Sequence, residues 1–277
     1  MRIVLRIIVL LVTHFFLLNN LQAQSKKKER KGEFYFSWGY NKEWYTKSTI
    51  RVMQPSLAND YKFTSISGHD HPGWDEGSIF KIPLSIPQYN YRLGYFFNKK
   101  KGLAFEINFD HTKFIFADQN ARVVGKLNNR QVDTTVAFNP TNGYYYYLNN
   151  GANFLLFNIV KRWPIYQTKN KNFKIDFLCK AGVGPVIPHV ENKFGSLGGD
   201  KGNDPGFQLG GWNIGAEGTI KTTFFNTVFL EYCNKLDYAS YSGLKVYQGT
   251  ARHSFGTYEM ILNLGVTIPM GKHIEKK

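Results

Sequence analysis

The sequence predicts an all-β protein, an eight-stranded antiparallel up-and-down transmembrane β-barrel with a charged, plugged interior. Three observations predict this fold. Eight segments alternate in polarity with a period of two residues, and their connections alternate between long and short. The charged positions fall on one face of these segments, while the other face is aromatic and aliphatic. Aromatic residues make up 16% of the chain, which suits both strands and the interfacial girdles of membrane barrels.

The chain begins with a segment, residues 1–24, that has the features of a secretory signal peptide. Arg2 and Arg6 precede an apolar stretch, and Ala23 supplies the small residue expected at a cleavage site. An N-terminal membrane anchor is the alternative, although the apolar stretch is short for a spanning helix. We expect export to the outer membrane of a Gram-negative bacterium, with residues 25–277 forming one barrel domain.

The clearest alternation lies in residues 88–116, which read as two strands joined by a polar turn at 98–102. One face of this hairpin is predicted to carry Tyr89, Tyr91, Leu93, Tyr95, Phe97, Leu103, Phe105, Ile107 and Phe109. The opposite face carries Gln88, Asn90, Arg92, Gly94, Ala104, Glu106, Asn108 and Asp110. A sheet with one greasy face and one face charged in both signs is typical of a barrel that meets lipid outside.

Six further segments repeat the pattern. They are residues 33–45, 145–160, 173–183, 209–221, 227–238 and 253–266. In 145–160 the assignment of faces stays open, because residues 154–157 are continuously apolar. Cys179 and Cys233 are expected on separate strands and opposite faces, so we predict no disulfide bond.

The connections between these segments run long, short, long, short, long, short, long. The long ones are predicted as outer loops near 46–87, 118–143, 184–207 and 239–252, and residues 61–67 could extend a strand beyond the membrane. Short turns on one side and long loops on the other are the signature of bacterial outer-membrane barrels.

A soluble eight-stranded barrel of the lipocalin sort is the rival fold, and the two have opposite polarity. A soluble barrel is apolar inside, whereas here the enclosed face is the charged one. The predicted inward set contains Glu43, Arg92, Glu106, Asp110, Lys174, Asp176, Lys180, Glu217, Lys221, Glu231, Lys235, Asp237 and Glu259. On the lipid side, each Lys or Arg at mid-bilayer would cost about 2–4 kcal/mol. The membrane barrel is therefore favoured.

The formal charge of +15 raises the question of nucleic-acid binding, which we exclude. The lysines cluster at the chain ends and in the short turns, and no recognised nucleic-acid fold presents them. A basic rim beside anionic lipid headgroups explains them, as does solvation of turn residues. The expected partners are outer-membrane lipid and lipopolysaccharide, with an envelope protein as a further possibility, and no cofactor is expected.

The mature chain resembles the small eight-stranded outer-membrane barrels of Gram-negative bacteria, such as the OmpA transmembrane domain, OmpW-like barrels and lipid A deacylases of the PagL kind. The resemblance is greatest to a family of uncharacterised outer-membrane barrel proteins. It is carried by residues 44–48 (WYTKS), 86–95 (IPQYNYRLGY) and 109–113 (FDHTK). It implies a fold and a location but no assigned chemistry.

Charged residues on the inward face form the first candidate site. Arg92, Glu106, Lys180, Glu217, Glu231, Lys235 and Glu259 are predicted to form interior ion pairs. An eight-stranded barrel is only just wide enough for its side chains, so these pairs would plug the lumen. A catalytic carboxylate cluster is the alternative reading.

Two weaker candidates involve histidines. His253, Ser254 and Glu259 suggest a lipid A-modifying enzyme, the alternative to a non-enzymatic barrel with an envelope-structural or partner-binding role through its outer loops. PagL-type deacylases place His and Ser two residues apart, on one strand face, whereas here the two are adjacent. His69, His71 and Asp75 in the first outer loop could hold a metal ion, although a lone HxH in a loop is usually only loop.

Overall fold

The structure is a computed structural model that describes residues 32–71, 88–139, 144–148, 150–194 and 204–270. The predicted signal peptide, residues 1–24, lies outside the described residues. The described part is built from strands and one short 3-10 turn. None of the helical segments in this part is long and apolar enough to cross a membrane.

The strands are β1 (Glu33–Tyr45), β2 (Ser48–Gln54), β3 (Asn59–Ile66), β4 (Gly68–His69), β5 (Tyr89–Asn98), β6 (Leu103–Asp110), β7 (Phe114–Phe116), β8 (Gln119–Leu127), β9 (Arg130–Phe138), β10 (Tyr144–Leu148), β11 (Phe154–Gln167), β12 (Phe173–Pro185), β13 (Glu191–Phe194), β14 (Gly211–Phe224), β15 (Val228–Val246) and β16 (Gly249–Pro269). The 3-10 turn η1 (Pro55–Leu57) joins β2 to β3.

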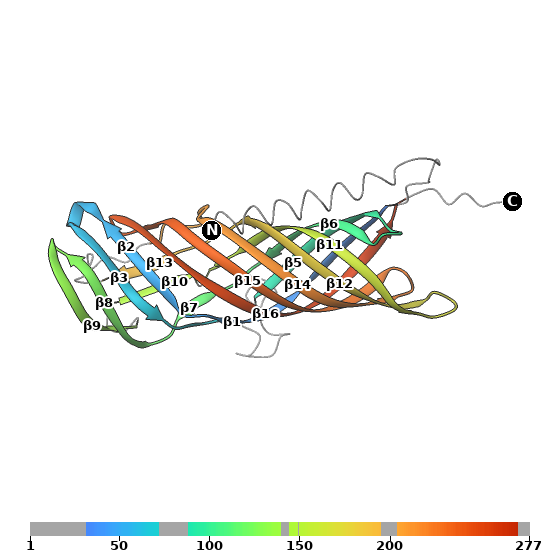
Figure 1. Cartoon of the computed structure of the whole chain (residues 1–277), viewed down its shortest axis with the longest axis horizontal. Coiled ribbons are helices and arrows are strands. Elements are labelled where there is room, and N and C mark those ends of the chain that lie inside the picture. Colours follow the sequence, from blue (N-terminus) through green and yellow to red (C-terminus); the bar gives the residue numbers. More distant parts are fainter. Residues whose placement is uncertain (1–31, 72–87, 140–143, 149, 195–203, 271–277) are drawn as a thin grey trace, which may run out of the picture. The chain divides into compact units, whose positions relative to one another are not determined.

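Eight of these strands form a closed antiparallel ring in the order β1-β5-β6-β11-β12-β14-β15-β16, and β16 pairs again with β1. Closure leaves no unpaired strand edge within the ring. A sheet in lipid requires this, because lipid cannot form hydrogen bonds with unpaired backbone groups. The predicted fold class, an eight-stranded antiparallel barrel, is confirmed. Figure 1 shows β5, β6, β11, β12, β14 and β15 side by side.

The two faces of the ring differ as the sequence predicts. Leu93 is 51% exposed on the outside, whereas its neighbour Arg92 is 0% exposed inside. The open assignment in the fourth segment is settled by β11: Phe157 and Ile159 face outward, and Leu156 is buried. The continuous apolar run arises because Leu156 belongs to an apolar core at that end of the ring. The ring is therefore built as a membrane barrel, apolar outside and charged within.

The short turns follow β5, β11 and β14, and we call this end of the ring the short-turn end. The structure corrects one of these turns. Residues 161–172 lie between the predicted segments 145–160 and 173–183, so the sequence predicts a short connection there. Their first part, with Trp163 and Pro164, is strand, because β11 continues to Gln167. Pro164 lies at a register shift in the pairing with β12, which is where a residue without an N–H fits into a ladder.

The opposite end carries folded hairpins where the sequence predicts loops. Residues 239–252 belong mainly to β15 and β16, which close in a tight turn at Tyr247 and Gln248, the latter at φ 51°. Within 46–87 and 118–143 lie the hairpins β2–β3 and β8–β9, which extend the sheet beyond β16 in the order β2-β3-β8-β9. Figure 1 shows these four strands grouped at one end.

A second sheet, β13-β10-β7-β4, lies with these hairpins, and together they form what we call the head. The head has its own apolar core, which joins residues from both sheets and from the ends of β15 and β16. It includes Ile50, Val52, Phe63, Phe114, Phe116, Val123, Tyr146, Leu148, Tyr241, Leu244 and Phe255. Along β2 and β3 these residues alternate with more exposed ones, so hydrophobic burial explains why the outer segments fold.

Candidate functional site

The ring encloses a connected set of ion pairs, which we call the lumen chain. Its members are Arg92, Glu106, Asp110, Lys180, Glu217, Lys221, Glu231, Lys235, Asp237 and Glu259. Its order follows from strand register, since inward positions on neighbouring strands face each other. Lys180 lies opposite Glu217, which lies opposite Lys235, and Lys235 lies opposite Glu259. Opposite charges therefore alternate across β12, β14, β15 and β16, the arrangement that cross-strand pairing favours.

Lys180 lies closer to the short-turn end than Arg92 and Lys235, two other cations of the lumen chain. Its Nζ lies 3.1 Å from Glu106, 3.0 Å from Glu217 and 3.5 Å from Glu231. Glu106 also accepts a hydrogen bond from the Tyr35 hydroxyl at 2.7 Å. All the side chains in this group are almost fully buried, so each charge depends on these partners rather than on water.

Arg92 and Lys235 continue the lumen chain toward the head. Arg92 contacts Glu217 at 3.0 Å and Asp110 at 3.2 Å. Lys235 contacts Asp110 at 2.6 Å, Asp237 at 3.0 Å and Glu259 at 3.1 Å. The structure thus joins the seven predicted interior residues through direct contacts. It adds Asp110 and Asp237 to them and, through a contact of 3.5 Å with Glu231, Lys221.

Glu43 marks the end of the lumen chain under the head, where two carboxylates meet. It lies opposite Glu259 in the β1–β16 pairing, a like-charge pair that cross-strand packing disfavours. The Asn41 amide and the Tyr45 hydroxyl donate hydrogen bonds to Glu43. These donors stabilise a carboxylate whose strand neighbour is also acidic, and the lumen is filled by side chains at this level.

The structure places the three residues of the enzyme hypothesis in different surroundings. His253 is buried in the head, stacked on Tyr241 with ring centroids 4.8 Å apart. Glu259 lies in the lumen against Lys235. Ser254 is on the other face of β16, and its backbone oxygen accepts a hydrogen bond from Ser48.

A different serine lies beside His253. Ser48 Oγ is 3.3 Å from His253 Nδ1, and the Tyr146 hydroxyl is 3.1 Å from Nε2. Sequence reasoning missed this trio because its members come from three segments more than 90 residues apart, with no spacing that links them. Ser48, Tyr146 and His253 are all buried within the apolar core, so the trio holds the head together from inside.

The metal hypothesis concerns the first outer segment. The described residues hold no group of three or more His, Cys, Asp or Glu side chains placed to bind a metal ion. His69 Nδ1 lies 2.8 Å from the backbone oxygen of Asp70, and the backbone N–H of His71 donates to Gln88. Asp75 lies outside the described residues, so the hypothesis stays a prediction.

The two cysteines are free. Cys179 is exposed on the outer face of β12, and Cys233 is buried in the lumen on β15. The strand β14 separates them in the ring.

No protein-family model matches the chain, and no curated protein matches it. Among solved structures, the chain is similar to the outer membrane protein OprG from Pseudomonas aeruginosa, at 11% identity and a TM-score of 0.39, covering 88% of this chain and 99% of that one. It is also similar to the outer membrane protease OmpT from Escherichia coli, at 11% identity and a TM-score of 0.37, covering 90% and 99%. Ail, the attachment invasion locus protein of Yersinia pestis, is similar at 12% identity and a TM-score of 0.30, covering 86% and 99%.

These structural neighbours are small outer-membrane β-barrels, the class that the sequence resembles. All three TM-scores lie below 0.5, so the fold described above rests on strand pairing and register.

Proposed function

We propose that the chain is a non-conducting outer-membrane barrel protein whose head binds anionic groups on the cell surface, lipopolysaccharide in particular. The short-turn end then faces the periplasm and the head faces outward, as in the usual arrangement of bacterial barrels. The observation that carries the binding part of the proposal is a row of cations on the exposed face of the head.

This row, which we call the basic row, consists of Arg252, Arg51 and Lys62 on the adjacent strands β16, β2 and β3. Arg252 lies opposite Arg51, and Arg51 lies opposite Lys62. Their strand neighbours Val52 and Tyr61 point the other way, into the apolar core, so the three cations share the outer face.

Only one carboxylate neutralises the basic row within the described residues. Asp60 forms a two-point ion pair with Arg51, with distances of 2.6 and 2.7 Å. Like charges directly opposite each other across strands destabilise a sheet. A phosphate or carboxylate from outside the chain would relieve that repulsion, and the phosphates of lipopolysaccharide lie at this surface of the membrane.

The lumen chain supports the non-conducting part of the proposal. Its cations and carboxylates fill an interior that eight strands leave barely wide enough for side chains. The apolar core of the head lies at the outer end of the ring. We expect no steady conductance in planar membranes, and steady conduction by the purified chain would disprove this part.

Binding is tested by titrating purified lipopolysaccharide into the full chain in a zwitterionic detergent. Replacing both Arg252 and Lys62 with Gln should weaken binding at least tenfold, because each removes a charge-assisted contact. The matched control replaces Lys169 and Lys171 with Gln, which removes two exposed lysines from the turn after β11 at the opposite end of the ring. An unchanged affinity in the double variant would refute the proposal.

The lipid A-modifying alternative predicts a change in the acylation of lipid A when the chain is expressed. His253 has no access to a substrate in the described structure, because its side chain is enclosed by the head. Mass spectrometry of lipid A with and without the chain separates the two functions, and altered acylation that is lost in His253→Gln would favour the enzyme.

A further inference from the structure

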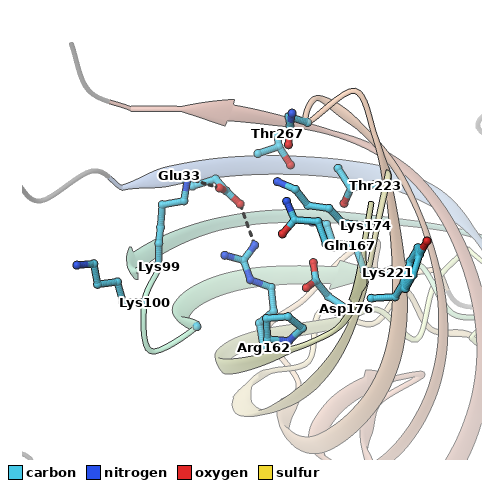
Figure 2. Close-up of a pocket in the computed structure, with 14 residues that line it drawn as sticks. Glu33, Lys99, Lys100, Arg162, Gln167, Lys174, Asp176, Lys221, Thr223 and Thr267 are labelled. Atoms are coloured by element: carbon cyan, nitrogen blue, oxygen red, sulfur yellow. Dashed lines mark hydrogen bonds and ion pairs between the residues drawn. The ribbon is translucent and has the colours of Figure 1, made fainter. Parts of the chain in front are cut away.

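The short-turn end of the ring holds a cavity of about 200 Å³, which we call the mouth. It is lined by Glu33, Lys99, Lys100, Gly102, Arg162, Pro164, Tyr166, Gln167, Lys174, Asp176, Lys221, Thr223, Asn226 and Thr267. Five of these side chains are cationic and two are carboxylates, so the lining has an excess of three positive charges. Figure 2 shows Glu33, Arg162, Lys174 and Asp176 around one space, whereas the side chain of Lys100 points away from it.

One of the two carboxylates of the mouth, Glu33, already forms ion pairs within it. Glu33 accepts Lys99 at 2.7 Å and Arg162 at 3.0 Å, as the dashed lines in Figure 2 mark. Lys174 forms no ion pair with any described residue, and neither does Asp176. The mouth therefore keeps cationic groups that its own carboxylates leave unneutralised.

Lys221 is an independent observation that points to an anion in the mouth. Its side chain is 1% exposed, and its Nζ has no hydrogen-bond acceptor. The nearest carboxylate oxygen, from Glu231, is 3.5 Å away, and the ring of Phe229 lies 3.3 Å away. Unlike Lys180, which has carboxylates at 3.0 and 3.1 Å, Lys221 has its one carboxylate partner among the described residues at 3.5 Å, so an anion or a water molecule in the mouth would satisfy its N–H donors.

The other groups of the mouth suit an oxyanion. Gln167 and Asn226 carry amide N–H donors, and Thr223 and Thr267 carry hydroxyls. The volume is below the 300–1,000 Å³ typical of pockets for drug-sized ligands, and it suits a single headgroup or small ion. Arg and Lys together are the usual recognition groups for phosphate.

We propose that the mouth binds a phosphate group, presented either by an anionic phospholipid of the inner leaflet or by a soluble phosphate compound of the periplasm. Lys174 and Lys221 are the cations that the bound phosphate would neutralise, with Arg162 shared between it and Glu33. This site lies at the end of the ring opposite the basic row, and it does not depend on what the head binds.

Two measurements on the full chain distinguish the sources. In micelles of a zwitterionic detergent, calorimetry measures binding of inorganic phosphate. In nanodiscs, native mass spectrometry compares retention of phosphatidylglycerol with that of phosphatidylcholine. Phosphate binding without preferential lipid retention identifies a soluble ligand, and preferential retention of phosphatidylglycerol identifies the lipid. Either outcome supports a phosphate site.

Lys174→Gln is the decisive variant, because Lys174 is partly exposed and its replacement breaks no ion pair within the described chain. We expect about tenfold weaker binding, the effect of losing one charge-assisted contact. Lys169→Gln, an exposed lysine in the turn after β11 that does not line the mouth, is the matched control and should bind like the parent chain. Heat-modifiable migration in unboiled gels verifies that both variants are folded.

The proposal is overturned if inorganic phosphate does not bind and phosphatidylglycerol is not retained in preference to phosphatidylcholine. It is also overturned if Lys174→Gln and Lys169→Gln weaken binding equally, because that result would show attraction by net charge alone.

Discussion

The lumen and the head are both enclosed, yet the lumen is filled with charges and the head with hydrocarbon. Arg92 and Phe63 are each 0% exposed, one among carboxylates and the other among aromatic rings. The difference follows from what surrounds each region. Outside the ring lies lipid, so moving an apolar side chain from the outer face to the lumen gains little. Around the head lies water, and burial of apolar surface stabilises it directly.

Ion pairs can therefore stabilise the correct packing of the lumen, as hydrophobic contacts stabilise that of the head. A slip of one residue would turn the lumen charges of the slipped strand toward lipid, so the lumen chain selects the correct register. In the head, the same alternation buries apolar side chains and leaves the basic row exposed. The predictions below test this contrast between an interior held by charge and an interior held by apolar burial.

The largest effect is expected from Arg92→Ala. It leaves Asp110 and Glu217 in the lumen with one cation fewer, and breaking a buried pair costs about 3–5 kcal/mol. The matched control is Leu93→Ala, next in sequence and facing lipid, where one apolar surface replaces another. Urea unfolding in bilayers measures both free energies of unfolding. Equal, small losses would show that the lumen is not held by charge.

The sequence predicted the lumen better than the head, and particular residues show why. Alternation alone assigns Arg92, Lys180 and Glu217 to the inside, because a ring strand has only two faces and one of them meets lipid. The predicted outer loop at 239–252 was wrong, because its Ser and Gly residues resemble loop while Tyr241 and Leu244 anchor it to a core contributed by other segments. The Ser48–His253 contact likewise depends on tertiary structure, and nothing in the spacing of these residues indicates it.

The next effect concerns space rather than charge in the lumen. An added Cβ at Gly94 would lie 2.0 Å from the ring of Tyr35, whose hydroxyl donates to Glu106. Gly94→Ala must displace that ring, and overpacking of this kind costs about 1–3 kcal/mol. At Gly218, by contrast, the nearest atom would lie 3.9 Å away, so Gly218→Ala is the control. The same urea unfolding compares them, and equal stability of the two variants would contradict tight packing around Tyr35.

A smaller and more local effect is expected in the head from Ile50→Val. Ile50 is fully buried in the apolar core, and removal of one buried methylene costs about 0.5–1.5 kcal/mol. Amide hydrogen exchange should show faster opening of β2 and β3, with the ring strands β11 and β12 unchanged. Uniformly faster exchange in ring and head would instead show that the two interiors unfold as one unit.

The smallest effect is expected at the surface of the head, where Arg51 pairs with Asp60 in contact with water. The hydrogen bond from Arg51 lowers the pKa of Asp60 below its usual value of 3.8. A carboxyl whose folded pKa is depressed stabilises the fold above pH 3.8, and this contribution is lost as the pH falls through the folded pKa. Because the two side chains are 29% and 46% exposed, Arg51→Gln should cost only about 0.2–1 kcal/mol at neutral pH.

Amide exchange of the β2–β3 hairpin tests this expectation. It is measured in the parent chain and in Arg51→Gln at pH 7 and at a pH below the depressed folded pKa of Asp60, after correction for the intrinsic pH dependence of exchange. The difference between the two chains should shrink in acid, when Asp60 is protonated in both. Added salt at pH 7 should reduce the difference as well, because the pair is exposed. A loss as large as that of Arg92→Ala would mean that ion pairs matter as much in water as in the lumen, and it would remove the contrast between the two regions.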